Sequence, residues 1–332
     1  MHKFSIILPV RNGGDYIKHC VKSILTQKLQ NFNLIILDNC SSDGTVDWLL
    51  SLKSEKITIY KSEEPLSIED NWARAMTVPR NEFMTLIGHD DILHPEYLEV
   101  INRLIEDNPS SGLYQTHFDF IDGKGDFIRS CLEMKTNIIP SVFLERVLRN
   151  KIEITGTGFM MRTTDYDKMG GIPLYPNLLY ADIELVMELI KHTNLAVAKE
   201  NTFQFRFHIN NTSKSSGLRR LMAFETMVRY LKGLEYQNTT YKKIIENNVN
   251  YFLKSYVTGA CHKLLYIPKK NREGITINKI VKSAEKASAS LAPGLNFRPH
   301  NISGVILAKI VDSNTIFSSI FRWLKGFKKR TF

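Results

Sequence analysis

Short apolar segments of strand length alternate with helical segments in the first 107 residues, and this alternation constrains the fold more than any other feature. Residues 4–9 (FSIILP) are apolar without alternation, which is typical of a strand buried on both faces. Similar runs predict strands over residues 34–37, 57–60 and 83–87. Capping residues and helical spacing predict helices over residues 15–27, 46–52, 67–76 and 95–107. This order of elements predicts an α/β fold with a mostly parallel sheet flanked by helices.

The chain changes character near residue 217, where strand alternation stops and helices rich in Lys and Arg begin. Residues 206–332 contain 23 Lys and Arg against 6 Asp and Glu, a net charge of +17, whereas residues 1–205 have a net charge of −7. We therefore predict two domains, residues 1–215 with the sheet and residues 216–332 as a basic, mainly helical region. Nucleic acid, an anionic membrane surface and a phosphorylated acceptor are the candidate partners of the basic region.

Several patterns bear on the cellular compartment. No segment reaches the roughly 20 apolar residues that a membrane-spanning helix needs. The first apolar run ends after about seven residues at Arg11, which favours a strand over an export signal. Cys20, Cys40, Cys131 and Cys261 lie far apart, so neither a zinc site nor a disulfide framework is indicated. We therefore expect a protein of the reducing cytoplasm.

Polar residues follow three of the predicted strands: Arg11-Asn12, the segment from Asp38 to Asp43, and His89-Asp90-Asp91. We expect them to line one cleft, because ligands bind at the carboxyl ends of strands in open α/β sheets. Asp90 either caps the next helix, with Asp91 solvated, or binds a divalent cation that also holds a diphosphate. Its position beside the other two clusters favours the cation site. Asp38 either accepts hydrogen bonds from a base or ribose or is a turn residue.

Further candidates lie between residues 156 and 208. Asp182 is in the first turn of an amphipathic helix, where it is either a favourable charge at the helix N-terminus or a general base. Arg206 and His208 share one face of an extended segment. Such a histidine is usually structural or solvated, but beside a carboxylate it would suit manganese. Gly156 and Gly158 either allow a substrate close to the backbone or form a plain turn.

Other known binding patterns are absent from the sequence. There is no GxGxxG after the first strand and no GxxxxGK[ST] anywhere, which disfavours a dinucleotide site and a P-loop. There is also no RNP sequence or zinc-finger pattern, so we do not expect a nucleic-acid partner.

Residues 3–212 resemble the family-2 glycosyltransferases with a GT-A fold, particularly bacterial enzymes that build capsule, O-antigen and similar surface polysaccharides. Five motifs in the family's order carry the resemblance: Ser5 to Asn12, Asp38 to Thr45, Gly88 to Asp91 in the place of Asp-x-Asp, Ala181-Asp182 in the place of Glu-Asp, and Arg206-x-His208. The resemblance implies a GT-A domain in residues 1–215, followed by a C-terminal helical extension.

The resemblance also implies an inverting, metal-dependent glycosyltransferase. It would move a sugar from a nucleotide-diphosphate sugar, with a UDP-sugar favoured, to a saccharide acceptor, usually a lipid-linked one. The implied nucleotide-sugar-binding residues are Pro9, Arg11, Asn12, Asp38, Asn71, His89 and Asp90. Mn²⁺ or Mg²⁺ would bind Asp90, with His208 as a further ligand. Asp182 would deprotonate the acceptor hydroxyl, and Gly156, Gly158 and Asp91 would lie on the acceptor side.

Two departures from the family pattern leave alternatives open. Gly88 replaces the first Asp of Asp-x-Asp, and Ala181 replaces the Glu before the expected base. Metal affinity could therefore be low, and a catalytically weak nucleotide-sugar-binding relative is one alternative. A metal-dependent nucleotidyltransferase of a sugar phosphate is another alternative. Such enzymes have a basic, glycine-rich first loop, and Arg11-Asn12-Gly13-Gly14 is a short match to it with a single basic residue.

The C-terminal segment from Ile316 to Arg330 mixes aromatic and basic residues. Its apolar residues recur at helical spacing, which suits a helix lying on an anionic membrane surface. That interpretation would place the protein peripherally on the inner face of the cytoplasmic membrane. The alternative is a helix docked on its own domain or on a second subunit, which would allow an oligomer.

Overall fold

The structure is a computed structural model that describes residues 2–207 and 217–328. It separates into two compact units, residues 1–143 with 152–211 and residues 144–151 with 212–332. Our expected boundary at 215/216 lies four residues after the division between residues 211 and 212. The second unit also includes residues 144–151, which we had expected in the first domain.

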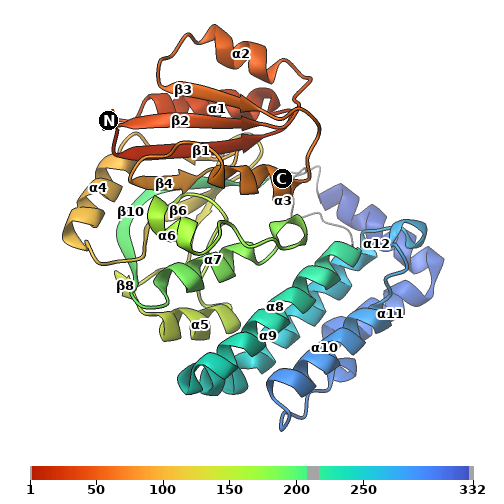
Figure 1. The fold of residues 1–332 in the computed structure, drawn as a ribbon. Helices are drawn as coiled ribbons and strands as arrows, with labels where there is room; N and C mark the ends of the chain where they lie inside the picture. The colour runs from red at the N-terminus through yellow and green to blue at the C-terminus, as the bar shows by residue number, and fades with distance from the viewer. Residues whose placement is uncertain (1, 208–216, 329–332) are drawn as a thin grey trace. The chain divides into compact units, whose positions relative to one another are not determined.

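Ten strands of the described residues form the sheet of the first unit, with the order β3-β2-β1-β4-β9-β6-β10-β5 (Figure 1). In addition, β7 pairs with β6 and β8 with β10. The strands are β1 (Phe4–Val10), β2 (Phe32–Asp38), β3 (Ile57–Lys61), β4 (Phe83–Leu86), β5 (Ile92–Leu93), β6 (Leu113–Ile121), β7 (Phe127–Ser130), β8 (Asn137–Ile138), β9 (Phe159–Arg162) and β10 (Leu195–Arg206).

The first four strands form a parallel half-sheet, as the alternation of elements predicted. β1 pairs in parallel with both β2 and β4, and β2 pairs in parallel with β3. All seven residues of β1 are buried, because strands lie on both of its edges and both faces of the sheet are covered. This burial explains why its sequence is apolar without alternation.

The remaining strands make the sheet mixed rather than mostly parallel. β9 lies between β4 and β6 and runs antiparallel to both, while β6 and β10 are parallel. The short strands β5, β7 and β8 all pair antiparallel with their neighbours. Our expectation of a mostly parallel sheet therefore holds for β1 to β4 and for the β6–β10 pair, whereas β9 enters the sheet in the opposite direction.

Helices connect the strands of the first unit. They are α1 (Gly14–Leu25), α2 (Thr45–Ser51), α3 (Ile68–Ala73), α4 (Tyr97–Asp107), α6 (Thr163–Lys168) and α7 (Ala181–Ile190), with the 3-10 turns η1 (Arg74–Met76) and η2 (Pro176–Leu178). Helix α5 (Pro140–Leu148) begins in the first unit and ends in the second. Helix α1 buries Ile17, Cys20, Val21 and Ile24, the residues whose spacing predicted it. Helices α2, α3 and α4 also occur where the sequence predicts them.

The second unit is helical, as expected. Its elements are α8 (Gly217–Gln237), α9 (Thr239–Leu265), η4 (Lys269–Asn271), α10 (Ile277–Leu291), η5 (Pro299–Asn301), α11 (Ser303–Ser313) and α12 (Thr315–Lys328). Helix α9 is central, since α8, α10 and α11 all pack against it (Figure 1). The rings of Phe224 and Tyr256 stack at 3.4 Å between α8 and α9. Within the part of the chain that the structure describes, none of the helices has the length and apolarity to cross a membrane.

Candidate active site

The three polar clusters follow neighbouring strands of the parallel half-sheet. β2, β1 and β4 are adjacent, so their carboxyl ends lie at one edge. Asp38 ends β2 opposite Val10 of β1, and Leu86 of β4 lies opposite Ile7. The structure therefore brings together the segments after Val10, at Asp38 and after Leu86, as the β–α–β spacing predicted.

Hydrogen bonds join the loop after β1 to the loop after β2. The Asn12 N–H donates to Ser41 Oγ at 2.9 Å, and the Ser42 N–H donates to Asn12 Oδ1 at 2.8 Å. Gly13 N–H donates to Thr45 Oγ1 at 3.0 Å. Asn12 has a left-handed backbone with φ 54°, which asparagine tolerates better than most residues. Asn12 therefore links the two loops through both its backbone and its side chain.

The residues on either side of this loop differ in accessibility. Pro9 is buried within β1, opposite Leu37 of β2. Arg11 is exposed directly after the strand. Of these two predicted nucleotide-sugar-binding residues, only Arg11 presents its side chain at the surface.

Asp38 has one carboxylate oxygen without a partner. The residue is 2% exposed, and its Oδ2 accepts a hydrogen bond from the Ser41 N–H at 3.3 Å. Its Oδ1 is buried and has no hydrogen-bond partner among the described residues. Because a buried polar atom is costly to leave unpaired, this oxygen suits a donor on a ligand. An N–H of a base or a hydroxyl of ribose has the required chemistry.

Arg74, which our sequence analysis did not single out, holds this part of the site together. Its guanidinium donates to Asp38 O at 2.9 Å, to Asn71 Oδ1 at 2.9 Å and to Tyr60 O at 2.8 Å. Asn71 is 4% exposed and donates from Nδ2 to Leu37 O at 3.3 Å. Arg74 and Asn71 thus tie α3 to the ends of β2 and β3. Their i, i+3 spacing on a predicted helix is the signal that could have indicated such a pair.

The loop from Gly88 to Asp91 is fixed by Arg206, the last residue of β10. The Arg206 side chain is buried, with Nε donating to Asp90 O at 2.7 Å and Nη1 to Asp122 O at 3.0 Å. The Arg206 N–H also donates to Asp91 Oδ1 at 3.0 Å, and Thr157 Oγ1 donates to Asp91 Oδ2 at 2.7 Å. Arg206 therefore positions both aspartates, a role we had not assigned to it from the sequence.

The two aspartates lie in different environments. Asp91 is 1% exposed, and burial raises its pKa well above the usual range, with the negative charge of Asp90 adding to the shift. The hydrogen bonds from Thr157 and Arg206 oppose that rise in the pKa. Asp90 and His89 are half-buried. The structure thus places Asp91 inside the protein, away from the surface where an acceptor would lie, and leaves Asp90 accessible.

Gly88 leaves space that the carboxylates of the two following aspartates occupy. A Cβ on Gly88 would lie 2.7 Å from Asp90 Oδ1 and 3.0 Å from Asp91 Oδ2. Both carboxylates therefore converge on the space that a side chain would fill. With the loop in this conformation, an Asp at position 88 would collide with Asp90.

Of the two predicted metal ligands, only Asp90 lies within the described residues. No three His, Cys, Asp or Glu side chains gather within residues 2–207 and 217–328 to form a protein cage for a metal. His208, the predicted second ligand, lies outside the described residues. Mg²⁺ is commonly held by one or two carboxylates together with substrate phosphates. Asp90 therefore fits a divalent ion whose other ligands come mainly from a diphosphate and water.

Asp182 lies in the first turn of α7 and is half-buried. The Ile183 N–H donates to Asp182 Oδ1 at 2.9 Å. Burial raises the pKa of Asp182 to about 6, against the opposing effect of that hydrogen bond. A carboxylate with this pKa is mostly ionised at neutral pH yet binds a proton more readily than an ordinary aspartate, as a general base requires.

The segment before α7 is strained and contacts α3. Asn177, Leu178 and Tyr180 all have positive φ, of 55°, 55° and 71°. The Asn177 N–H donates to Glu69 Oε1 at 2.6 Å. Since α3 carries Glu69 as well as Asn71, this bond places the segment before Asp182 beside the helix that contacts the end of β2. Strained backbone of this kind concentrates at functional sites.

The two candidate glycines on the acceptor side differ. Gly158 has φ +79°, and a Cβ there would lie 2.7 Å from the ring of Phe203. The backbone conformation and this close approach both require glycine. Gly156 is half-buried and has open space around its Cβ position. Packing thus accounts for Gly158, and an acceptor contact at Gly156 stays a prediction.

Comparisons with known proteins place these observations in a family. The family model described as glycosyl transferase family 2 matches residues 5–170, half of the chain. Glycosyltransferase GlyG of Streptococcus pneumoniae is 22% identical over 125 residues, which make up 37% of this chain and 42% of GlyG. The matched region thus spans less than half the length of that relative.

Two solved structures resemble the chain over most of its length. S. aureus TarS 1–349 in complex with UDP-GlcNAc has a TM-score of 0.63 at 13% identity, covering 88% of this chain and 90% of that one. Mannosyltransferase PcManGT from Pyrobaculum calidifontis, in complex with GDP-Man and Mn²⁺, has a TM-score of 0.53 at 12% identity, covering 98% of this chain and 84% of that one. At these identities the likeness shows the fold alone, and it confirms the predicted GT-A fold.

Proposed function

Because this chain belongs to glycosyl transferase family 2, we propose that it transfers a sugar from a nucleotide-diphosphate sugar to a saccharide acceptor. One observation carries the proposal. Asp38, with its unpaired buried oxygen, and Asp90, on a loop fixed by Arg206, follow strands on either side of β1 at one edge of the sheet. A donor with a nucleoside at one end and a diphosphate at the other matches these two positions.

The nucleoside would occupy the Asp38 side of the cleft. Asp38 Oδ1 would accept a hydrogen bond from the base or ribose, while Arg74 and Asn71 hold the ends of β2 and β3 in place. Arg11 is exposed after β1 and has the charge to attract the diphosphate. We favour a UDP-sugar, and the similar structure of TarS contains UDP-GlcNAc.

The diphosphate would lie on the Asp90 side. Mn²⁺ or Mg²⁺ bound at Asp90 would neutralise the charge that develops on the departing nucleoside diphosphate. PcManGT, which shares the fold, has been solved with Mn²⁺. The hydrogen bond from Arg206 Nε to the Asp90 carbonyl at 2.7 Å would hold the loop that carries this ligand.

Asp182 is our proposed base. It would take the proton from the acceptor hydroxyl, whose oxygen then attacks the anomeric carbon in line with the bond to the diphosphate. Such a displacement inverts the configuration at that carbon. Glu184 is a weaker candidate, because its carboxylate accepts a hydrogen bond from the Tyr175 hydroxyl.

Product analysis tests the proposed reaction. The protein would be incubated with UDP-, GDP- and dTDP-sugars and Mn²⁺, with and without mixed lipid-linked saccharides, and the released nucleotide would be identified. We expect nucleoside diphosphate from one nucleotide class. Release of pyrophosphate from a nucleoside triphosphate and a sugar phosphate would instead establish a nucleotidyltransferase, and donor binding without release would indicate a catalytically weak relative.

We also propose that the C-terminal helices contact an anionic membrane, where a lipid-linked acceptor of surface polysaccharide synthesis would reside. In α12, Ile316, Phe317, Ile320 and Trp323 are each 48–64% exposed, which is unusual for large apolar side chains on a soluble surface. This helix lies in the strongly basic half of the sequence. Deleting residues 314–332 should reduce sedimentation with anionic liposomes. Unchanged sedimentation would contradict the membrane contact and favour docking on protein.

A further inference from the structure

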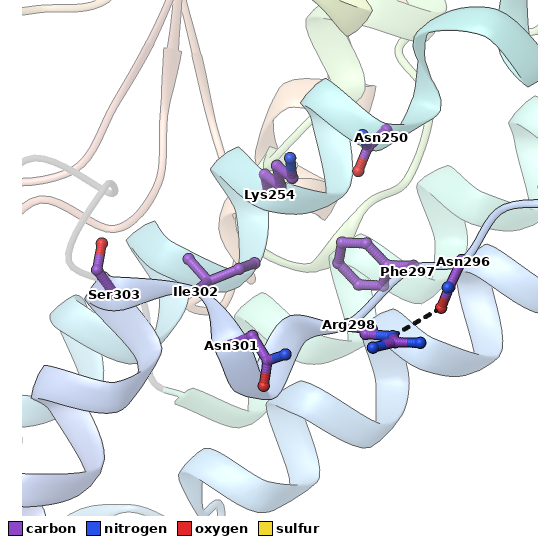
Figure 2. Close-up of a pocket in the computed structure, with 8 residues that line it drawn as sticks. All are labelled: Asn250, Lys254, Asn296, Phe297, Arg298, Asn301, Ile302 and Ser303. Carbon is purple, nitrogen blue, oxygen red and sulfur yellow. Dashed lines mark hydrogen bonds between the residues drawn. The ribbon is translucent and has the colours of Figure 1, made fainter.

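A hollow of about 410 Å³ lies in the second unit, between α9 and residues 296–303 (Figure 2). Most of its lining residues are exposed. Arg298 Nε donates to Asn296 Oδ1 at 3.0 Å, and Figure 2 shows the guanidinium turned toward Asn296 and away from Lys254. The described side chains around this hollow therefore converge on no common ligand.

In the first unit, the backbone that leads into α7 has a conformation that is costly for its residue types. Asn177, Leu178 and Tyr180 all have left-handed φ, of 55°, 55° and 71°. Residues other than glycine incur a steric penalty there, and such backbone persists only where the surrounding structure holds it. Contacts from outside the segment are therefore needed to keep it in place.

This segment determines where α7 begins. Tyr180 is the N-cap residue of α7, and it provides no side-chain hydrogen bond to the helix. Its carbonyl accepts hydrogen bonds from the N–H groups of Ile183 and Glu184, at 3.1 and 3.4 Å. Asp182 lies in the turn that these two bonds close. The position of Asp182 thus follows the position of Tyr180.

Glu69 of α3 provides a contact from outside the segment. The Asn177 N–H donates to Glu69 Oε1 at 2.6 Å, across 108 positions of the sequence, and α3 packs against η2. A hydrogen bond to a carboxylate is stronger than one between neutral groups. Both residues are half-buried, so water competes less for this bond than at an exposed position. The bond therefore anchors the segment to α3.

Helix α3 is in turn fixed to the nucleotide side of the proposed site. Asn71 Nδ2 donates to Leu37 O at 3.3 Å. Arg74, directly after α3, donates to Asp38 O at 2.9 Å. One short stretch, residues 69–74, thus contacts both the end of β2 and the segment before Asp182.

We propose that Glu69 is a positioning residue for the transfer reaction: it holds the segment before α7 and so fixes the Asp182 carboxylate relative to the nucleotide end of the site. The inference rests on the proposed function, in which Asp182 is the base. Glu69 acts through Asn177 and the turn that follows, not on the reacting atoms. Because a misplacement of about 1 Å can slow a reaction about 10²-fold, loss of this contact should affect turnover more than donor binding.

Variants of Glu69 that differ in length and charge test whether it holds the segment. Glu69→Ala removes the acceptor, Glu69→Asp keeps the charge but is one methylene shorter, and Glu69→Gln keeps the length and an acceptor oxygen. Hydrogen exchange at the amides of residues 177–184 should be about tenfold or more faster in the Ala and Asp variants, and close to the wild-type rate in the Gln variant. Unchanged exchange in β1 would show that the fold is retained.

Turnover separates positioning from a merely structural role. With the donor that the wild type uses, kcat for nucleoside diphosphate release should fall by about tenfold or more in Glu69→Ala and Glu69→Asp. The donor Kd, measured by calorimetry, should stay near the wild-type value, and Glu69→Gln should restore kcat. The matched control Asp70→Ala removes an exposed carboxylate from the same helix and should change neither quantity.

Each alternative outcome has a distinct meaning. Wild-type exchange in Glu69→Ala, or faster exchange with an unchanged kcat, would overturn the positioning role. A loss of donor affinity as large as the loss of kcat would overturn it too, by assigning Glu69 to the nucleotide side. If Glu69→Ala does not fold, the Asp and Gln variants make the same comparison. A wild type that releases no nucleoside diphosphate would refute the proposed function and the catalytic role of this contact, whereas the exchange rates decide separately whether Glu69 holds the segment.

Discussion

Replacing Asp182 with asparagine separates catalysis from folding at the proposed base. The substitution keeps the shape of the side chain, and the asparagine Oδ1 can still accept the hydrogen bond that Ile183 N–H donates at 2.9 Å. Donor binding should therefore be retained. Turnover should fall by about 10²–10⁴-fold, the usual contribution of a general base.

The same substitution should change stability in a direction set by the pKa of Asp182. Burial raises this pKa from 3.8 to about 6, so the native state holds the proton more firmly than the unfolded chain. The stability that this protonation provides is complete below pH 3.8 and is lost as the pH rises through about 6. The difference of about 2 pKa units corresponds to at most about 3 kcal/mol. Because the side chain is half-buried, solvent screening reduces this to about 1–3 kcal/mol.

Two assays check these expectations for Asp182→Asn. Urea unfolding should show the variant more stable than the wild type at neutral pH, with the difference shrinking as the pH falls from about 6 toward 3.8. The wild-type kcat/KM, which reports the pKa of the free enzyme, should rise with pH through about 6, where Asp182 loses its proton. The matched control is Glu184→Gln, which removes a charge from the same helical turn and should keep turnover. Wild-type turnover in Asp182→Asn, or equal stability at every pH, would refute the assignment.

Three further substitutions probe the supports of the site. Asp90→Asn should remove the stimulation of nucleoside diphosphate release by Mn²⁺, measured by metal titration; undiminished stimulation would contradict a metal at Asp90. Arg206→Met removes two charge-assisted hydrogen bonds and should lower the free energy of unfolding, measured in urea, by about 3–5 kcal/mol. The exposed control Arg103→Met should lower it by about 0–1 kcal/mol. An equally small loss in Arg206→Met would show that Arg206 does not stabilise the site. Gly158→Ala should lower the free energy of unfolding by about 1–3 kcal/mol, through backbone strain and overlap with Phe203, and so lower the thermal midpoint. Gly156→Ala should change the free energy of unfolding by no more than about 0.5 kcal/mol. Equal effects of the two substitutions would contradict the packing at Phe203.

The parallel half of the fold was predictable because its signals are local. A strand buried on both faces, such as β1, is a continuous apolar run in the sequence. The helical spacing of Ile17, Cys20, Val21 and Ile24 predicts the buried face of α1. β9 has no comparable signal, because the direction of a strand depends on neighbours that are distant in the sequence. The expectation of a mostly parallel sheet failed there.

The site divides in the same way. Asp38 and Asp90 follow predicted strands, so the topology alone indicated that they lie at one edge. Arg206 hydrogen-bonds to a residue 116 positions away, and Arg74 to one 36 positions away, and no short motif encodes such contacts. The conflict between Gly88 and the carboxylate of Asp90 likewise exists only in three dimensions. The placement of the candidate binding residues was thus easier to predict than the residues that hold them in place.

Calorimetric titration of the full chain with UDP-, GDP- and dTDP-sugars in the presence of Mn²⁺ is the most direct test of donor binding at the strand ends. We predict that one nucleotide class binds and that Asp38→Asn weakens it by about tenfold or more, because the buried acceptor for the nucleoside is altered. Asp47→Asn, an exposed carboxylate of α2, serves as the control and should bind like the wild type. Binding of none of these donors, or equal binding by Asp38→Asn and the wild type, would contradict the placement of the nucleotide sugar.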